Sequence, residues 1–389
     1  MSTHRPVVIS CDGHASGRPE DYAPYIEKAF QDDFDEWLQR QQVAQEARRR
    51  ARDQNQSLFS KEGSEAFEAA TGDDRDGEWD SATRTRVMDT EGVVLEVLFP
   101  NTTVPFGAFG ENAPHHLRGA GNRAYDRWLL DFANDDPARR APLAMLTAHD
   151  LDETVAEITW AADVGMAGFI VPTKPGAELP PWYDPMYDVI WAACQDTGLP
   201  VHFHGGGGTP DYGDYGVVSM LMYATEATYF SRRPLFELLW GGVFERFPEL
   251  TVVFTETRAD WVPSTLMFLD GIHSAPFFSH IRDTVTLRPS EYFQRQCYVA
   301  ASFMGPDESA MRHDIGLDKL MWGADYPHVE GTWPHTRKSL ARCFRDVPLE
   351  EATTILTDNP ARVYGFDIDA LQPIADEICP TVEELVGSG

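Results

Sequence analysis

The sequence contains few of the residues on which disulfide-linked and zinc-finger proteins depend. Its 389 residues include five cysteines, an odd number, and no two of them form a C-x-x-C pair. They are scattered along the chain: Cys11, Cys194, Cys297, Cys343 and Cys379. We therefore expect neither a disulfide framework nor a cysteine-based zinc site, and we predict a reduced, cytoplasmic protein.

Basic residues and long apolar runs are also scarce. The chain has 32 lysines and arginines against 62 acidic residues, which gives a net charge of -30. A surface of this sign repels phosphate backbones, so no nucleic-acid partner is expected. No apolar run approaches the roughly 18 residues of a membrane helix, and the polar segment Met1–Pro6 does not resemble a signal peptide. The expected partner is a small-molecule substrate.

The chain contains a regular alternation of apolar runs and helical segments. Hydrophobic residues make up 42% of the sequence, enough for a large core. Eight apolar runs are predicted strands: 6–14, 93–99, 140–146, 167–172, 200–204, 250–256, 297–303 and 319–325. Strands that alternate with helices predict a parallel sheet, and eight such units predict a closed (β/α)8 TIM barrel. An open doubly wound sheet is the alternative, but no G-x-G-x-x-G follows the first strand.

We predict that residues 1–389 form one barrel domain with two additions. Residues 15–80 break the alternation and are predicted to be a mainly helical insertion that covers a site or joins subunits; within it, 39–56 has the composition of a solvated helix. Residues 367–389 are a predicted acidic tail. The segment 205–232 begins with four glycines and is predicted to be a long loop; without a following Gly-Lys-Ser/Thr it is no phosphate loop. Its tyrosines and methionines serve either local packing or a substrate-lining lid.

Side chains with nitrogen and oxygen donors follow several of the predicted strands. They are Asp12 and His14, His202 and His204, Glu256, and Asp325. The carboxyl ends of barrel strands converge on one mouth, and residues two apart on a strand share a face. Each alone has an ordinary alternative, because an Asp after a strand often caps a helix and a paired His-x-His is often satisfied at a strand end. Together they predict a site for a divalent metal.

The sequence resembles the amidohydrolase superfamily, in particular the group of aminocarboxymuconate-semialdehyde decarboxylase. The segments that carry the resemblance are Asp12–His14, Glu91–Pro100, Gly198–His204, Phe247–Phe254, Trp322–His328 and Asn359–Gly365. The resemblance implies a metal-dependent barrel and a homo-oligomer, a dimer. It also implies four metal ligands at the matching positions: Asp12, His14, His204 and Asp325.

One position departs from the resemblance. The decarboxylases of this group usually carry a catalytic histidine at the end of the sixth strand, where this chain has Glu256. A carboxylate there could ligate or bridge a second metal, which would favour a binuclear hydrolytic site. The alternative is a salt bridge between Glu256 and Arg258 or another nearby base. Cys11 should point to the opposite face of its strand from Asp12 and is not a predicted ligand.

The predicted mechanism uses a divalent metal, one or two ions per chain, to activate a water molecule and polarise a carbonyl group. The donors include no thiolate, so Zn, Fe(II) and Mn(II) all suit the site. Asp325 is the expected ligand and proton carrier. His202 is expected to orient a ligand or the substrate, with direct ligation as the alternative. His328 is expected to contact the substrate or orient a ligand, unless it is an ordinary loop histidine.

The function predicted from the sequence is hydrolysis of a carbonyl-centred bond: an ester, a thioester or an amide. The alternative is non-oxidative decarboxylation of an aromatic or muconate-like acid. A binding protein that kept the barrel without turnover is a third possibility, disfavoured by the intact donor set. Aromatic residues near the mouth point weakly to an apolar or aromatic substrate, and they are also ordinary packing residues: Phe203, Trp261, Trp322 and Tyr326.

Overall fold

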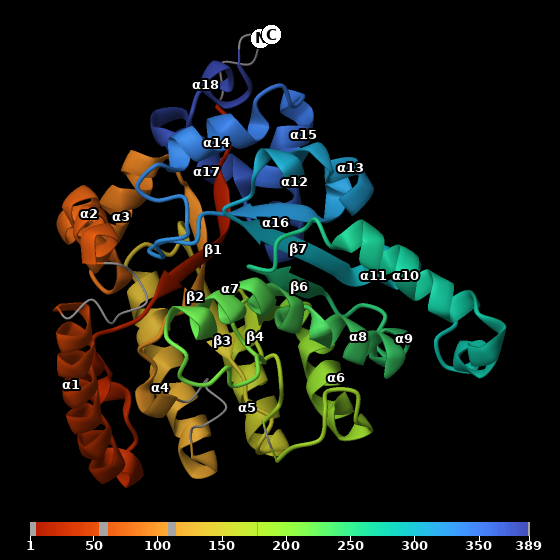
Figure 1. Cartoon of the computed structure of the whole chain (residues 1–389), viewed down its shortest axis with the longest axis horizontal. Coiled ribbons are helices and arrows are strands. Elements are labelled where there is room, and N and C mark those ends of the chain that lie inside the picture. Colours follow the sequence, from red (N-terminus) through yellow and green to blue (C-terminus); the bar gives the residue numbers. More distant parts are fainter. Residues whose placement is uncertain (1–4, 54–60, 108–113, 177, 388–389) are drawn as a thin grey trace.

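A computed structural model describes residues 5–53, 61–107, 114–176 and 178–387 and confirms the barrel (Figure 1). Its eight strands are β1 (Ile9–Ala15), β2 (Leu95–Pro100), β3 (Arg140–Met145), β4 (Gly168–Ile170), β5 (Val201–His204), β6 (Val252–Thr255), β7 (Cys297–Ser302) and β8 (Leu320–Gly323). Each strand pairs in parallel with the next, from β1 to β8. All eight predicted strands are present.

The ring of strands closes where β8 returns to β1. A parallel bridge joins Gly13 to Tyr326. The amide of Asp325 donates to the carbonyl of Asp12 over 2.9 Å, and the amide of His14 donates to the carbonyl of Tyr326 over 2.6 Å. Closure therefore places the carboxyl ends of β1 and β8 side by side. That contact brings two of the predicted metal-binding segments together.

Helices surround the strands. They are α3 (Ser81–Glu91), α4 (His115–Asn134), α5 (Leu151–Asp163), α6 (Asp188–Thr197), α7 (Val217–Ser231), α8 (Arg233–Trp240), α9 (Val243–Arg246), α10 (Val262–Ser274), α11 (Pro289–Gln296), α12 (Pro306–Ala310), α13 (Arg312–Ile315), α14 (Thr336–Phe344), α15 (Leu349–Thr353) and α16 (Asn359–Tyr364). Local signals define their ends: Asp80 caps α3 and Asp150 caps α5 through side-chain bonds to backbone amides, and Gly92 ends α3 with a φ of 78°.

The insertion after β1 is mainly helical, as predicted. It contains η1 (Pro19–Tyr25), η2 (Lys28–Phe30), α1 (Gln31–Asp53), α2 (Lys61–Thr71) and η3 (Gly72–Glu78). Helix α1 begins earlier than the predicted span 39–56, of which 54–56 lie outside the described residues. In Figure 1, α1 and α2 lie along one flank of the barrel. Phe34 and Trp37 are buried and stack with ring centroids 5.5 Å apart, which attaches the start of α1 to the core.

Two segments are more ordered than the sequence suggested. The predicted loop 205–232 contains the 15-residue helix α7, because the stretch after Gly216 has no glycine or proline to interrupt a helix. The predicted acidic tail forms α17 (Ile368–Ile378) and α18 (Val382–Val386). Leu371 and Ala375, four residues apart, are buried and give α17 an apolar side against the core.

Two further observations concern the cysteines and the helices. All five cysteines are buried and unpaired. Among the described helices, none has both the length and the apolar character that crossing a membrane requires.

Candidate metal centre

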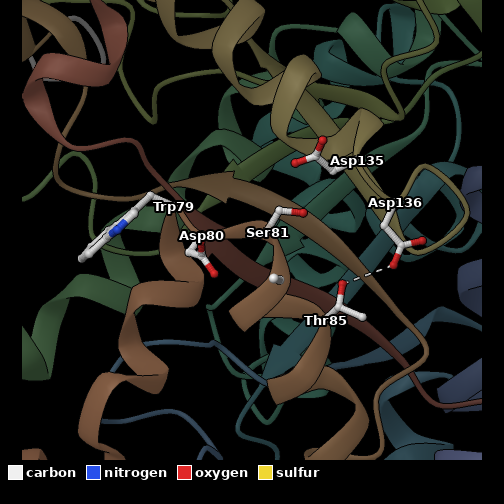
Figure 2. Close-up of a pocket in the computed structure, with 7 residues that line it drawn as sticks. Trp79, Asp80, Ser81, Thr85, Asp135 and Asp136 are labelled. Atoms are coloured by element: carbon white, nitrogen blue, oxygen red, sulfur yellow. Dashed lines mark hydrogen bonds between the residues drawn. The ribbon is translucent and has the colours of Figure 1, made fainter.

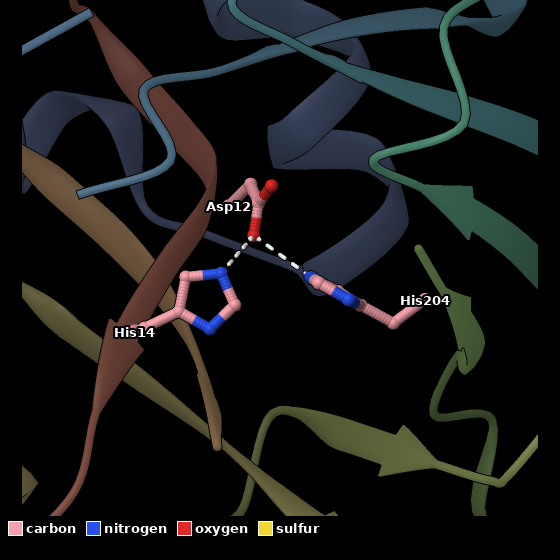
Figure 3. Close-up of side chains that lie close together, drawn as sticks. All are labelled: Asp12, His14 and His204. Atoms are coloured by element: carbon pink, nitrogen blue, oxygen red, sulfur yellow. Dashed lines mark hydrogen bonds and ion pairs between the residues drawn. The ribbon is translucent and has the colours of Figure 1, made fainter. Parts of the chain in front are cut away.

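Three of the predicted ligands meet at the mouth of the barrel (Figure 3). Asp12 and His14 come from β1, and His204 ends β5. The carboxylate Oδ1 of Asp12 lies 3.2 Å from Nε2 of His204 and 3.5 Å from Nε2 of His14. Asp12 and His14 are buried, and the side chain of His204 is 10% exposed. The two-residue spacing on β1 therefore places both side chains on one face, as the sequence indicated.

Asp325 and His328 complete the group from the loop after β8. Oδ1 of Asp325 lies 3.1 Å from Nε2 of His14 and 2.8 Å from Nδ1 of His328. Asp325 lies two residues after the end of β8 and adopts a left-handed backbone with a φ of 59°. Non-glycine residues hold this conformation uncommonly, and it costs roughly 1 kcal/mol or more, which contacts elsewhere in the fold must offset. The turn it makes directs the carboxylate toward His14.

The donor atoms fit a bound cation. His14 Nε2, both carboxylate oxygens of Asp325 and His328 Nδ1 are buried, and none makes a hydrogen bond of good geometry within the described residues. They lie instead in ion-pair contact around a common point. A buried polar atom without a hydrogen bond costs about 1–3 kcal/mol, and a divalent ion would satisfy several of these atoms at once. Asp12, His14, His204 and Asp325 could therefore hold a metal ion, with only nitrogen and oxygen donors.

Neighbouring groups fix the orientation of these donors. Nδ1 of His14 lies 2.9 Å from the carbonyl oxygen of Pro100. Because a carbonyl can only accept, the proton lies on Nδ1, and Nε2 presents a free lone pair to the centre. The hydroxyl of Ser302 donates to Oδ2 of Asp12 and leaves Oδ1 for the histidines. Sequence reasoning missed Ser302, although its position at the end of β7 matched that of the other predicted donors.

Glu256 faces the same centre from the end of β6. It also has a left-handed backbone, with a φ of 55°, and its Oε2 lies 3.3 Å from Nδ1 of His204. Arg258 pairs with Asp260 and Asp307, so the base that pairs with Glu256 is His204, which agrees with the second form of the alternative, a salt bridge to another nearby base. Glu256, Asp325, His328 and Glu330 also form a group of donors close enough to bind a cation. Glu330 was not predicted.

Burial and neighbouring charges shift the pKa values of the acids and histidines in this group. Burial, together with the charges of Asp325 and Asp12, raises the pKa of Glu256 to about 8 despite the opposing effect of His204. Burial alone would raise the pKa of Asp325, but its contacts with His14 and His328 lower it to about 2. Burial alone would lower the pKa of His328, but Asp325 raises it to about 9. Asp325 and His328 are therefore an ion pair in the metal-free protein.

His202 lies one layer deeper in the barrel and does not reach the centre. Its Nδ1 lies 3.1 Å from the hydroxyl of Thr255, and its Nε2 lies 3.2 Å from the hydroxyl of Tyr364. The residue is fully buried, and burial, with the nearby charge of His204, lowers its pKa to about 3. Both nitrogens have protein partners, so the geometry does not support the predicted contact between His202 and substrate or metal. His202 and His204 lie on the same face of β5, but His202 is one residue pair further from the mouth of the barrel.

The aromatic residues predicted to line the mouth are mostly core residues. Phe203 and Trp322 are fully buried, and Trp261 and Tyr326 are nearly so. A hollow of about 440 Å³ lies elsewhere, between α2 and the loop after β8. Its apolar lining includes Phe67, Phe303, Val329 and Trp333. Glu330 also lines it and belongs to the donor group that contains Glu256, Asp325 and His328.

A second hollow lies beside the start of α3 (Figure 2). Trp79, Asp80, Asp135 and Asp136 line it, and none of its lining residues belongs to the donor groups described above. Asp80 is engaged as the cap of α3, and Thr85 lies in hydrogen-bond contact with Asp136. Its polar groups are therefore explained by local structure.

The fold and the centre define a (β/α)8 barrel with carboxylates and imidazoles at the carboxyl ends of its strands. A profile of the amidohydrolase family matches residues 9–366, and the chain belongs to this family. A search of curated proteins found no match.

Solved structures share the fold at low sequence identity. An amidohydrolase from Mycobacterium avium subsp. paratuberculosis has a TM-score of 0.70 and 16% identity, over 94% of this chain and 100% of that one. The 5-carboxyvanillate decarboxylase of Sphingomonas paucimobilis has a TM-score of 0.64 and 19% identity, over 93% of this chain and 99% of that one. A dihydroxybenzoic acid decarboxylase from Polaromonas sp. was solved with manganese and the inhibitor 2-nitroresorcinol. It has a TM-score of 0.65 and 14% identity, over 92% of this chain and 97% of that one.

Proposed function

We propose that this protein is a metal-dependent, non-oxidative decarboxylase of a benzoate-type aromatic acid. The observation that carries the proposal is the 2.8 Å contact between Asp325 and His328 beside the group Asp12, His14 and His204. It combines a place for a divalent ion with a proton donor next to it. The sequence alone favoured hydrolysis, whereas several of the similar structures are decarboxylases of aromatic acids.

Decarboxylation breaks one carbon–carbon bond and needs one proton. Carbon dioxide leaves, the bonding electron pair stays on the ring carbon, and that carbon takes up a proton. A divalent ion bound to this group would supply positive charge that anchors the carboxylate and an adjacent oxygen of the substrate. His328, whose Nε2 lies 3.3 Å from the side-chain oxygen of Asn101, forms an ion pair with Asp325 through Nδ1. This pair would give the proton to the ring carbon and recover it from water.

The hollow between α2 and the loop after β8 supports an aromatic substrate. Its volume, about 440 Å³, lies within the range of small-molecule sites. Phe67 and Trp333 meet edge to face in it, with ring centroids 5.6 Å apart. Aromatic walls favour a planar ring, and Glu330 at the rim disfavours an extra negative charge on the part of the substrate that enters here.

Hydrolysis is the second candidate, and Glu256 is the observation in its favour. Glu256, Asp325, His328 and Glu330 could hold a second cation next to the first. Two adjacent ions would favour attack of water on a carbonyl group over loss of carbon dioxide.

Parallel assays separate the two candidates. The manganese-loaded protein is incubated with 2,6-dihydroxybenzoate and 5-carboxyvanillate, and carbon dioxide is measured; the same protein is tested on p-nitrophenyl acetate. The proposal predicts carbon dioxide release that stops after chelation and in Asp325→Asn, and persists in Asp318→Asn, a change at an exposed carboxylate. Ester cleavage with the same dependence, and no carbon dioxide, would establish hydrolysis instead.

A further inference from the structure

The four consecutive glycines after β5 each occupy a crowded position. A Cβ atom on Gly205 would lie 2.5 Å from Oε2 of Glu256, and one on Gly207 would lie 2.6 Å from the hydroxyl of Thr173. A Cβ on Gly208 would meet the methyl group of Thr173 at 2.8 Å. These distances are too short for any side chain. The glycines therefore let the loop pass between the ends of β4 and β6 at the mouth.

Gly206 is crowded by a residue of a different kind. A Cβ there would lie 2.7 Å from the hydroxyl of Tyr223, and the φ of Gly206, 86°, also suits glycine. Tyr223 belongs to α7, which in Figure 1 lies in front of the strands. Its hydroxyl donates to the carbonyl of Gly206 over 3.3 Å. Tyr223 thus rests on the loop next to Glu256, and the missing side chain at 206 makes room for it.

The hydroxyl of Tyr223 rests on Gly206, and the neighbouring Gly205 lies against the carboxylate of Glu256. Burial raises the pKa of Tyr223, and the negative charges of Glu256 and Glu330 raise it further. Both glutamates belong to the group that contains Asp325 and His328. The hydroxyl is therefore a neutral donor at neutral pH, close to the carboxylates that surround the proposed substrate position. Even so, 41% of the residue is exposed, so packing is not its main contribution.

We propose that Tyr223 is a substrate-contact residue, carried to the mouth by α7 and admitted by Gly206, and that its hydroxyl donates a hydrogen bond to an oxygen of the bound acid. The inference rests on the proposed function, since it takes the substrate to be an oxygen-bearing aromatic acid. On binding, the hydroxyl would exchange the carbonyl of Gly206 for the substrate oxygen. The tyrosine thereby selects acids with an acceptor oxygen at this position.

The binding test uses an inert probe, 2-nitroresorcinol, with the manganese-loaded full chain and titration calorimetry. Tyr223→Phe keeps the ring and removes the hydroxyl, and the dissociation constant is expected to rise about 3–10-fold, the effect of one hydrogen bond. Tyr215→Phe, a change at a 75% exposed tyrosine that precedes α7, is the matched control and should bind as the wild type. Equal affinity of Tyr223→Phe and the wild type would overturn the inference while leaving the proposed function intact.

The docking of α7 has a test that needs no ligand. In Gly206→Ala the new methyl group displaces the Tyr223 hydroxyl, so amides of residues 217–231 should exchange faster with deuterium. Gly165→Ala is the control, because Gly165 has a similar φ of 85° and no atom near its Cβ position. Equal exchange in both variants would show that Tyr223 does not hold α7. If the wild type binds no 2-nitroresorcinol, the benzoate assignment fails, and the substrate contact of Tyr223 fails with it, whatever the exchange shows.

Discussion

Two acidic residues of the candidate centre are held in an unfavourable backbone conformation. Glu256 directly follows β6 and Asp325 lies two residues after β8, and both have positive φ values, 55° and 59°. Non-glycine residues adopt this region uncommonly, aspartate more readily than glutamate, and residues held there cluster at functional sites. The conformation turns the chain sharply, so that each carboxylate points across the mouth instead of along its strand. No pattern in the sequence reveals such a turn.

Replacing Asp325 by asparagine should abolish most of the activity. Asparagine keeps the shape but loses the charge that holds the proton of His328 and faces His14. The rate of carbon dioxide release is expected to fall by about 10²–10⁴-fold, the range for a lost acid–base group. Unchanged rates, with folding confirmed by circular dichroism, would remove Asp325 from the mechanism.

His202 should make the protein sensitive to acid. Its pKa is about 3 in the folded protein because of burial and the charge of His204, against about 6.5 in an unfolded chain. Between these values the unfolded chain binds a proton that the folded protein does not, so stability falls as the pH drops below about 6.5. From pH 7 to pH 5 the free energy of unfolding of the wild type should fall by roughly 2 kcal/mol more than that of His202→Asn, measured by urea unfolding.

The control for this pH effect is His280→Asn. His280 is exposed in the folded protein, so its replacement should change stability equally at both pH values. If the unfolding free energies of His202→Asn and the wild type also differed by the same amount at pH 7 and pH 5, the buried, neutral state of His202 would be contradicted.

At the scale of elements, the strands were predictable and the depth of their side chains was not. Apolar runs such as 93–99 and 297–303 fixed all eight strands, because strands buried on both sides leave near-continuous apolar sequence. The position of Asp12, His14, His204 and Asp325 at strand ends was enough to predict that their side chains lie close together. The ring of His202 contacts Thr255 and Tyr364 instead of that group, because strand alternation predicts the face of a side chain but not its depth in the barrel. Ser302 ends β7 and could have been found by the same rule, whereas Tyr223 approaches the loop after β5 only through the packing of α7, which local sequence does not encode.

Helix α3 anchors the end of β1 through a buried arginine. Nε of Arg84 lies 2.6 Å from Oε2 of Glu96, and its Nη1 donates to the carbonyl of His14 over 2.7 Å. Arg84→Met would leave Glu96 buried without its partner, which should cost about 3–5 kcal/mol of unfolding free energy. Arg86→Met, also on α3, removes only an exposed ion pair with Asp74 and should cost much less. Similar costs for the two variants in urea unfolding would contradict this anchoring role.

Helix α2 should affect the choice of substrate. Phe67→Ala would open the aromatic hollow beside Glu330, and KM for aromatic acids is expected to rise about 10-fold or more, with kcat changed less. Glu62→Ala, on an exposed position of α2, is the control. If KM were the same in both variants, the insertion would not contribute to the substrate site.

For the molecule as a whole, the net charge of -30 and the exposed apolar residues have opposing effects on association. Met267 is 74% and Phe277 92% exposed, on α10 and the following turn, and exposed apolar surface favours a second copy of the chain. We predict a homodimer that salt strengthens by screening repulsion. Sedimentation of Met267→Asp/Phe277→Asp should show monomers, whereas Val43→Asp on α1 should remain dimeric. A wild-type monomer at high salt would refute the dimer.

The most direct test of the proposed function is metal content per chain, measured by elemental analysis on protein purified without chelators. We predict close to one equivalent of a divalent transition metal in the wild type and in Glu256→Gln, and almost none in Asp12→Asn. That result would establish a single ion held by Asp12, His14, His204 and Asp325. Two equivalents that fall to one in Glu256→Gln would indicate a binuclear hydrolase. No metal, with none taken up on reconstitution, would contradict both enzymatic functions.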